Sequence, residues 1–321
     1  MRGVLALSGG VGGAKLASGL SQVLPPAELL IVANTGDDFS HLGLPISPDL
    51  DSVMYALAGV SDEVRGWGRA GESWHCLEAL AELGADSWFQ LGDRDLATHI
   101  VRNAALASGQ SLTQVTAALC QRLGVRHELI PMSDQPVATT IQTDRGAMAF
   151  QHYFVREQCQ PLLLSVNFEG ADSAFYNPRI DKFLSSSFSP LVVICPSNPM
   201  LSVDPILALP GLRTVLERLP VIAVSPIVAG KAIKGPAAKI MAELSLPVSA
   251  LGVAEYYQGL VDVMAIDRLD AALAPDIEAL GMQVCIADTV MTTPDKRRSL
   301  AEHLLTFMDD FEHSSYPKAP I

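Results

Sequence analysis

The stretch MRGVLALSGGVGGAKLASGL at residues 1–20 decides the fold. A short apolar run leads directly into SGGVGG at residues 8–13, where four of six positions are glycine, and a helix-like segment follows. A strand that passes through a glycine turn into a helix is typical of the first unit of a parallel α/β sheet. The glycines either allow a tight turn with close strand–helix packing, or leave backbone N–H groups free to contact an anion.

More apolar runs follow along the chain, and most are continuous rather than alternating, which favours a parallel sheet covered on both faces. They are ELLIVANTG directly after the first helix, PLLLSVNF at 161–168, PLVVICPSNP at 190–199, PVIAVSPIV at 220–228, VDVMAID at 261–267 and MQVCIADT at 282–289. Between about 50 and 125 the pattern is helical, and 137–155 is typical of an antiparallel ribbon with DRG as its turn.

The sequence therefore predicts an α/β fold with a doubly wound, mostly parallel sheet and a largely helical insertion. We expect residues 1–50 and 160–310 to form the α/β core. Residues 51–159 are expected to form a mainly helical insertion that, with the ribbon, covers the site, and residues 311–321 a frayed tail.

Charge and hydropathy exclude some classes of function. The formal net charge of −13 argues against a protein that follows a nucleic-acid backbone, which needs a basic surface. No apolar run reaches the roughly 18–20 residues that span a bilayer, and the first run is broken by glycines too early for a secretory signal. We expect a cytoplasmic protein that acts on small molecules.

In doubly wound sheets, ligands bind beyond the carboxyl ends of the strands, and the unusual residues of this chain follow its predicted strands. SGGVGG is neither GxGxxG nor a P-loop, so the case for phosphate contact by Ser8, Gly9, Gly10, Gly12 and Gly13 is physical rather than a motif match. Lys15 follows the glycines and either reaches a phosphate or is an ordinary exposed helix lysine.

NTGDDFSHLGLPISPDLD at residues 34–51 is the most informative loop. It carries Asp37, Asp38, Asp49 and Asp51 beside Asn34, Thr35 and Ser47. Asp51 opens an apolar helix, so a helix cap accounts for one carboxylate. Four acids in one loop repel each other unless a cation or a substrate hydroxyl collects them, and oxygen ligands without Cys or His suit Mg²⁺.

Three further loops have both a functional and a structural interpretation. WFQLGDRDLATH at 88–99 sets Trp88 and Phe89 ahead of Asp93 and Arg94, and either packs against a planar ring or is a capped helix start. PSNP at 196–199 offers Ser197 and Asn198, and SPIVAGKAIKGP offers Ser225, Lys231 and Lys234. These two loops either bind a phosphate or base, or are ordinary turns. No Ser, Cys or His has the spacing of a covalent nucleophile and its base.

In this order along the chain, SGGVGGAKLASGL, NTGDDFSHLGLPISPDLDSVMYALAG, GWGRAGES, WFQLGDRDLATHIVRN, LIPMSD, PSNPMLSVDPIL and AVSPIVAGKAIKGPAAKIM resemble the 2-phospho-L-lactate transferase (CofD-like) family of coenzyme F420 biosynthesis. The resemblance runs from residue 1 to about 300. It implies a Rossmann-like core and Mg²⁺-dependent transfer of a phosphorylated three-carbon acid from its guanosine diphosphate conjugate to the deazaflavin Fo, with release of GMP. It also implies a homodimer.

The resemblance assigns roles to the residues singled out above. Asp51 and Asp38 would be catalytic, with Asp51 steering the attacking hydroxyl, and Asp37, Asp38 and Asp51 would hold Mg²⁺. The expected Fo contacts are Asp37, Ser47, Asp49, Trp88, Phe89 and Met132. The expected nucleotide and phosphate contacts are Ser8, Gly9, Gly10, Gly12, Gly13, Lys15, Asp93, Arg94, Ser197, Asn198, Ser225, Lys231 and Lys234. Family members differ in whether the donor carries 2-phospholactate, phosphoenolpyruvate or 3-phosphoglycerate, and the sequence leaves that choice open.

Two other functions compete with this interpretation. An NAD(P)-dependent oxidoreductase would need GxGxxG and one acid closing the second strand, whereas here the glycines are shifted and several acids follow. A non-catalytic nucleotide- or deazaflavin-binding protein would not need the acids of residues 37–51, yet all four are present.

Overall fold

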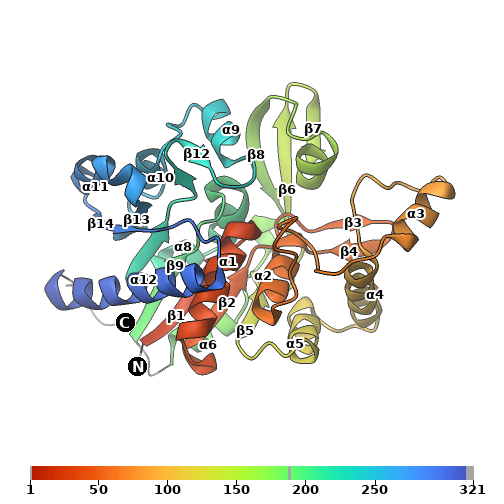
Figure 1. Cartoon of the computed structure of the whole chain (residues 1–321), viewed down its shortest axis with the longest axis horizontal. Helices are drawn as coiled ribbons and strands as arrows, with labels where there is room; N and C mark the ends of the chain where they lie inside the picture. The colour runs from red at the N-terminus through yellow and green to blue at the C-terminus, as the bar shows by residue number, and fades with distance from the viewer. Residues whose placement is uncertain (1, 187–188, 316–321) are drawn as a thin grey trace.

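A computed structural model describes residues 2–186 and 189–315. Within them a seven-stranded sheet runs through the middle of the molecule (Figure 1). In spatial order its strands are β14 (Gln283–Ala287), β13 (Val263–Asp267), β10 (Val221–Val224), β9 (Ser189–Ile194), β1 (Arg2–Ser8), β2 (Leu29–Ala33) and β5 (Glu128–Pro131).

Every neighbouring pair in this sheet is parallel. The chain winds from β1 outward through β2 to β5, and then returns to the other side of β1 with β9, β10, β13 and β14. The winding direction therefore reverses between β1 and β9, and a crevice opens at such a switch point beyond the strand ends. This confirms the expected doubly wound α/β fold.

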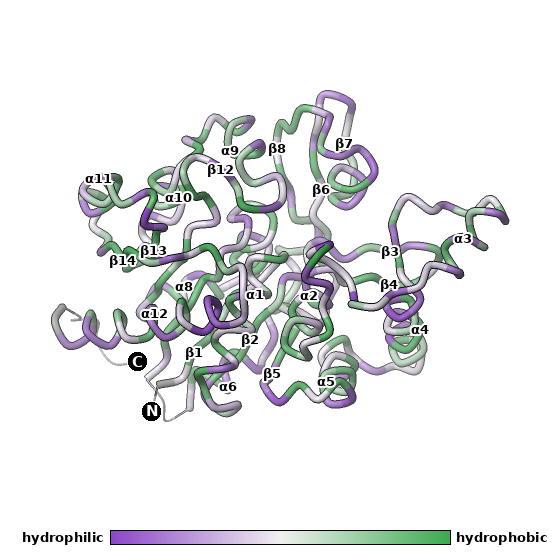
Figure 2. The backbone as a smooth tube through the Cα atoms, in the orientation of Figure 1, coloured by the Kyte–Doolittle hydropathy of each residue, from purple (hydrophilic) through white to green (hydrophobic). Residues whose placement is uncertain are grey.

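Alternating residues of the buried strands point to opposite faces of the sheet, and each face has its own core. Leu5 and Leu7 belong to one core, whereas Val4 and Ala6 belong to the other. Figure 2 shows hydrophobic segments of the backbone in the middle of the molecule, where these strands lie. The Val4 face is covered by α1 (Gly10–Val23), α2 (Pro48–Ala58), α5 (Leu112–Arg122) and α12 (Pro294–Ser315).

The Leu5 face is covered by shorter helices. They are α6 (Arg179–Leu184), α7 (Asp204–Leu207), α8 (Leu212–Leu216), α9 (Ala237–Glu243), α10 (Ala250–Tyr256) and α11 (Ala274–Ala279). The hairpin β3 (Phe39–His41) and β4 (Leu44–Ile46), with α3 (His75–Glu82) and α4 (Asp93–Ala107), extends to one side of the core (Figure 1). The helical pattern predicted between 50 and 125 thus corresponds to α2, α3, α4 and α5.

Two strands lie elsewhere than the sequence pattern predicts. The run at 161–168, expected in the parallel sheet, is β8 (Leu163–Glu169), which pairs antiparallel with β6 (Ala138–Thr143) in a separate sheet completed by β7 (Gly146–Ala149). Only part of β8 is buried, and an apolar run does not by itself reveal which sheet it joins. Conversely, β5 comes from the predicted insertion and forms one edge of the central sheet.

The ends of two other predicted segments also differ. The DRG turn joins β6 to β7 as expected, but the last residues of the predicted ribbon belong to a π-helix, His152–Arg156. Residues 311–315 of the predicted tail continue α12, because Phe311 is buried in the core on that side. The remaining residues, 316–321, lie outside the described part of the chain. Among the described helices, none is both long and apolar enough to cross a bilayer.

The glycine-rich turn packs tightly at the switch point. A methyl group at Gly12 would overlap the carbonyl oxygen of Pro196, and one at Gly13 would lie 2.6 Å from the Ser197 hydroxyl oxygen. Gly10 has a φ of +63°. A residue with a side chain would be strained in this conformation. The loops after β1 and β9 therefore approach each other more closely than side chains would allow.

We expect Gly12→Ala to lower the free energy of unfolding by about 2–3 kcal/mol, because the new methyl group has only backbone to displace. As a control, Gly109→Ala adds a methyl group in open space at a φ of +90°, and we expect a cost of about 1 kcal/mol. Urea denaturation of both variants measures the difference. Equal costs would mean that the two loops are not tightly packed.

Candidate active site

A cavity of about 660 Å³ opens at the switch point, above the carboxyl ends of β1 and β9. Its walls come from the glycine turn, the acidic loop, the segments at 65–67 and 88–90, the π-helical regions and the loop before α9. The lining residues are Gly9, Gly10, Val11, Gly12, Asp37, Pro48, Asp49, Ser52, Arg65, Gly66, Trp67, Trp88, Phe89, Gln90, Phe150, Gln151, Phe154, Val155, Gln158, Pro196, Ser197, Asn198, Leu201, Ser202, Pro226, Lys234, Gly235, Pro236 and Ala237.

A shared amide holds two carboxylates together on the cavity wall. Asn34, fully buried directly after β2, donates from Nδ2 to Asp37 Oδ1 at 3.1 Å and to Asp49 Oδ2 at 3.0 Å. Its Oδ1 accepts from the Gly36 N–H at 2.8 Å, which fixes the orientation of the amide. Gln151 donates to the second oxygen of Asp37 at 3.1 Å. We call Asn34, Asp37 and Asp49 the acid cluster.

The acid cluster is electrostatically strained. Burial, followed by the neighbouring charges of Asp49 and Asp38, raises the pKa of Asp37 well above its usual range. Burial also raises the pKa of Asp49, against the hydrogen bonds from Asn34, Gly10 and Ser202 that favour its charged form. Two adjacent carboxylates with raised pKa values lie where a proton or a cation would be stabilised.

The N-terminal turn of α1 lies beside the acid cluster. The Gly10 N–H donates to Asp49 Oδ1 at 2.6 Å, and the Gly9 N–H donates to Ser197 Oγ at 3.0 Å. The first turn of the helix, Gly10 to Gly12, lines the cavity. The positive dipole end of a helix N-terminus favours anions.

Aromatic side chains form another part of the wall. The rings of Phe150 and Phe154 are stacked, with centroids 5.5 Å apart, and Trp88 and Phe89 contact each other at 5.7 Å. Phe39 holds the latter pair, because its ring lies 4.8 Å from that of Phe89. Such a surface suits a flat aromatic ligand.

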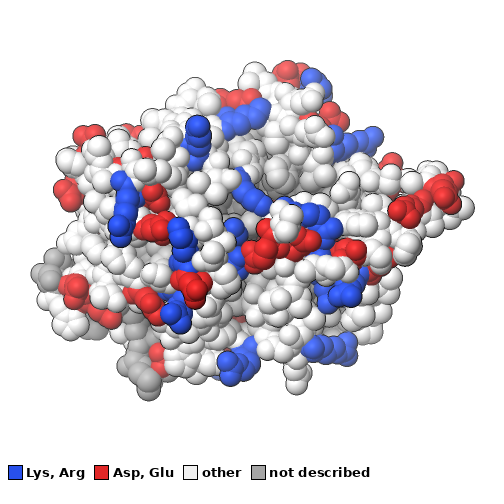
Figure 3. All heavy atoms as spheres, viewed as in Figure 1, with Lys and Arg blue, Asp and Glu red and all other residues white. Residues whose placement is uncertain are grey.

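Basic side chains also reach the cavity. Arg65 lies over the rings of Trp67 and Trp74 at 5.2 and 4.9 Å, and Lys234 donates to the Arg65 carbonyl oxygen at 3.4 Å. In the middle of this face, where Figure 1 draws α1 and α2 below β12 (Lys231–Ala232) and α9, Figure 3 shows lysines and arginines beside a group of acidic side chains. The cavity thus combines anion-binding groups, two carboxylates and aromatic surface.

Many of the residues predicted from sequence do meet in this cavity. They are Gly9, Gly10, Gly12, Asp37, Asp49, Trp88, Phe89, Ser197, Asn198 and Lys234. Ser8 and Gly13 lie behind the turn, where the Ser8 hydroxyl group is buried against Gly13. Lys15 lines a smaller neighbouring pocket.

Asp51 and Asp38 point elsewhere. Asp51 forms a buried, two-fold ion pair with Arg102 of α4, with Oδ2 at 2.9 Å from Nη1. Arg102 also contacts His99 at 3.1 Å. Asp38 accepts from the Ser47 hydroxyl at 2.7 Å, and burial raises its pKa well above the usual range. Neither lines the cavity, and their catalytic role stays a prediction.

Other predicted contacts also serve the fold. Asp93 lies in the first turn of α4, as the structural alternative expected, but its carboxylate accepts from the Ser73 hydroxyl and from the N–H groups that start α3. Met132 is fully buried in the core on the Leu5 face, too deep to contact a ligand in the cavity. Ser225 Oγ bonds the backbone of Ile227.

Two of the predicted nucleotide contacts, Arg94 and Lys231, are exposed and do not line the cavity.

The predicted three-carboxylate magnesium site is not assembled. Within the described residues, no group of three acid, His or Cys side chains has an arrangement that would hold a metal ion. Asp37 and Asp49, however, lie together at the cavity wall. Mg²⁺ commonly takes one or two carboxylates and completes its shell with water and substrate phosphates, so these two residues fit it.

Several residues of the site were missed from sequence. Asn34 stood in the quoted loop, and its position directly after a strand was the signal that could have identified it. Gln151, Phe150 and Phe154 come from the end of β7 and the π-helix after it, and π-helices have no recognised sequence signature. Ser202 belongs to a second π-helix, Pro199–Val203.

The chain is similar to known proteins over nearly its whole length. The family model for the 2-phospho-L-lactate transferase CofD matches residues 4–298. A 2-phospho-L-lactate transferase of Methanosarcina acetivorans is 40% identical over 306 residues, which cover 95% of this chain and 99% of the relative. A phosphoenolpyruvate transferase of Streptomyces avermitilis is 39% identical over 315 residues, covering 96% and 98%.

A crystal structure shares the fold. It is that of a UPF0052 family protein from Bacillus halodurans, with a TM-score of 0.60, 14% identity, and coverage of 95% of this chain and 98% of that one. At this identity the likeness supports the fold alone.

We expect Asp37→Asn to raise the thermal midpoint of the ligand-free protein at pH 8 by about 2–4 °C. A carboxyl with a raised pKa in the folded state contributes stability below its unfolded pKa and loses it as the pH rises through the folded value. The gain should therefore shrink as the pH falls toward 5. A lower midpoint than wild type at pH 8 would show that Asp37 is not electrostatically strained.

We expect Asp51→Leu to cost about 3 kcal/mol of folding stability, because it leaves the Arg102 guanidinium buried without its partner. The double variant with Arg102→Met should regain at least about 1 kcal/mol of that loss. Urea denaturation of the two single variants and the double variant completes the cycle. Strictly additive losses would argue that the pair is not a structural unit.

Proposed function

Because the chain belongs to the 2-phospho-L-lactate transferase CofD family, we propose that it transfers a phosphorylated three-carbon acid to the ribityl hydroxyl of the deazaflavin Fo. The donor is the guanosine diphosphate conjugate of 2-phospho-L-lactate, phosphoenolpyruvate or 3-phosphoglycerate. GMP leaves, and an F420-0 type product forms. The observation that carries the proposal is the acid cluster, which lies beside the first turn of α1 in one cavity.

Two sets of cavity residues suit the two substrates. The N–H groups of the first turn of α1 and the loop at 196–198 offer donors to a diphosphate, with Lys234 as a nearby cation. Trp88, Phe89 and the stacked pair Phe150 and Phe154 offer flat apolar surface to a tricyclic ring. A cavity of about 660 Å³ is within the usual range of small-molecule sites.

The chemistry requires positioning and a proton acceptor rather than a protein nucleophile. The hydroxyl oxygen of Fo forms a bond to the phosphorus that carries the acid. The bond from that phosphorus to the bridging oxygen breaks, and GMP leaves with the oxygen. We assign the proton acceptor to a carboxylate of the acid cluster, Asp37 or Asp49.

Mg²⁺ is part of the proposal, held by Asp37 and Asp49. When bound, it would neutralise charge on the diphosphate. Asn34 fixes the spacing of the two carboxylates, and Gln151 orients the outer oxygen of Asp37. We expect a cytoplasmic homodimer.

A non-catalytic protein that binds the nucleotide or the deazaflavin is the competing proposal. The acid cluster does not support this alternative. Burying Asp37 beside Asp49 lowers the stability of the fold, and a protein that only binds ligands has no need of such a pair. Family membership leaves the NAD(P)-dependent oxidoreductase without support.

The test is a mass-spectrometric assay with Fo, Mg²⁺ and each of the three guanosine-linked acids in turn. We expect one donor to give a product of Fo plus a phosphorylated acid, with an equal amount of GMP. Asp49→Asn should lower turnover at least about 100-fold. Asp288→Asn, an exposed acid paired with Lys296, is the matched control and should keep wild-type turnover.

Two results would count against the proposal. Binding of Fo without transfer from any donor would favour the non-catalytic protein. Full activity of Asp49→Asn would remove the acid cluster from the mechanism.

A further inference from the structure

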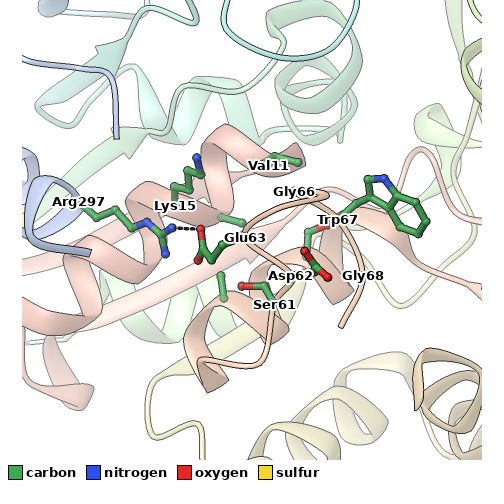
Figure 4. A pocket seen from close by; sticks show the side chains of 12 residues that line it. Val11, Lys15, Ser61, Asp62, Glu63, Gly66, Trp67, Gly68 and Arg297 are labelled. Atoms are coloured by element: carbon green, nitrogen blue, oxygen red, sulfur yellow. Dashed lines mark hydrogen bonds and ion pairs between the residues drawn. The ribbon is translucent and has the colours of Figure 1, made fainter. Parts of the chain in front are cut away.

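A second, smaller pocket adjoins the cavity. We call it the annex, and it is lined by Lys15 of α1, Arg297 of α12 and Glu63 from the segment after α2, among others (Figure 4). Its volume is about 30 Å³, and it shares Val11 and Trp67 with the main cavity. The annex is therefore a side chamber of the proposed active site, next to the first turn of α1.

The annex holds one cation, Lys15, that has no ion-pair partner among the described residues. Lys15 has no hydrogen bond or ion pair to any residue that the structure describes, although it is half-buried. Burial and then the charges of Arg297 and Lys234 lower its pKa. Arg297 is only 4% exposed, and its Nε has no partner within the described chain. Two carboxylates also line the annex, and each has a basic partner: Asp62 pairs with Arg65, and Glu63 pairs with Arg297. A half-buried lysine without a partner, beside a buried guanidinium group, lies where an anion would be stabilised.

Glu63 occupies part of this site. It forms an ion pair with Arg297, drawn as a dashed line in Figure 4, yet its side chain is 53% exposed and belongs to a surface segment. An exposed partner can move into solvent at little cost, whereas Arg297 is held by the packing of α12 on α1. The Glu63 carboxylate thus occupies the position beside Arg297 that the carboxylate of a ligand could take.

Size selects the kind of anion. One water molecule needs a cavity of about 10–15 Å³. At about 30 Å³, the annex has room for a carboxylate group but not for a nucleoside. On the basis of the proposed function, we propose that the annex binds the carboxylate of the donor's three-carbon acid through Lys15 and Arg297, in place of Glu63. Lys15 and Arg297 are then specificity residues that distinguish a phosphorylated carboxylic acid from other phosphate esters.

The test compares two ligands that differ only in the carboxylate. The probes are 2-phospholactate and isopropyl phosphate, titrated calorimetrically into the full chain. We expect wild type to prefer 2-phospholactate by about tenfold or more, as a charge-assisted contact would give. Lys15→Met, which keeps the apolar stem of the side chain, should abolish this preference.

Glu63→Gln should act in the opposite direction and strengthen 2-phospholactate binding, because it removes the competing carboxylate. General damage to the fold would weaken binding in both variants, so opposite signs identify the annex. Lys296→Met is the matched control, since this lysine is paired with Asp288 and does not line the annex. It should bind like wild type.

The proposal is overturned if wild type binds both probes equally, or if millimolar 2-phospholactate gives no binding. An equal loss of both probes in Lys15→Met also overturns it, because Lys15 would then hold the phosphate. Turnover with Fo is measured in parallel. A carboxylate preference without transfer contradicts only the proposed function, and transfer without the preference contradicts only the annex.

Discussion

The Asn34 side chain holds together the groups on which the site depends. Its amide donates to both Asp37 and Asp49, and thereby joins the loop after β2 to the start of α2. Asp49 in turn accepts from the first N–H of α1. Three elements that leave the sheet next to its switch point are thus joined through one buried side chain. The cost is a pair of close carboxylates, which only a proton or a cation relieves.

The glycine turn makes this arrangement possible. Because Gly12 and Gly13 lack side chains, the loops after β1 and β9 pack directly against each other. The first turn of α1 can then face the cavity with its backbone. Of the two explanations left open by the sequence, close packing is confirmed by these contacts. Contact with an anion is part of the proposed function.

The sequence predicted what depends on local pattern. Strand runs, the doubly wound order and the cavity at the strand ends followed from apolar segments and the glycines and acids after them. It could not assign β8 and β5 to their sheets, because pairing depends on distant partners. It also could not separate Asp49 from Asp51: both open α2, but one faces the cavity and the other faces Arg102. Helical spacing distinguishes such faces only once the partner helix is known.

The central claim is that Asp37 and Asp49 together form the metal-binding part of an active site. The most direct measurement is a crystal structure of the protein soaked with Mn²⁺ and GDP, with an anomalous difference map at the manganese edge. The account predicts one peak between the Asp37 and Asp49 carboxylates, in contact with a phosphate oxygen. A peak at Asp38 and Asp51, or an ordered nucleotide with no metal at the acid cluster, would contradict it.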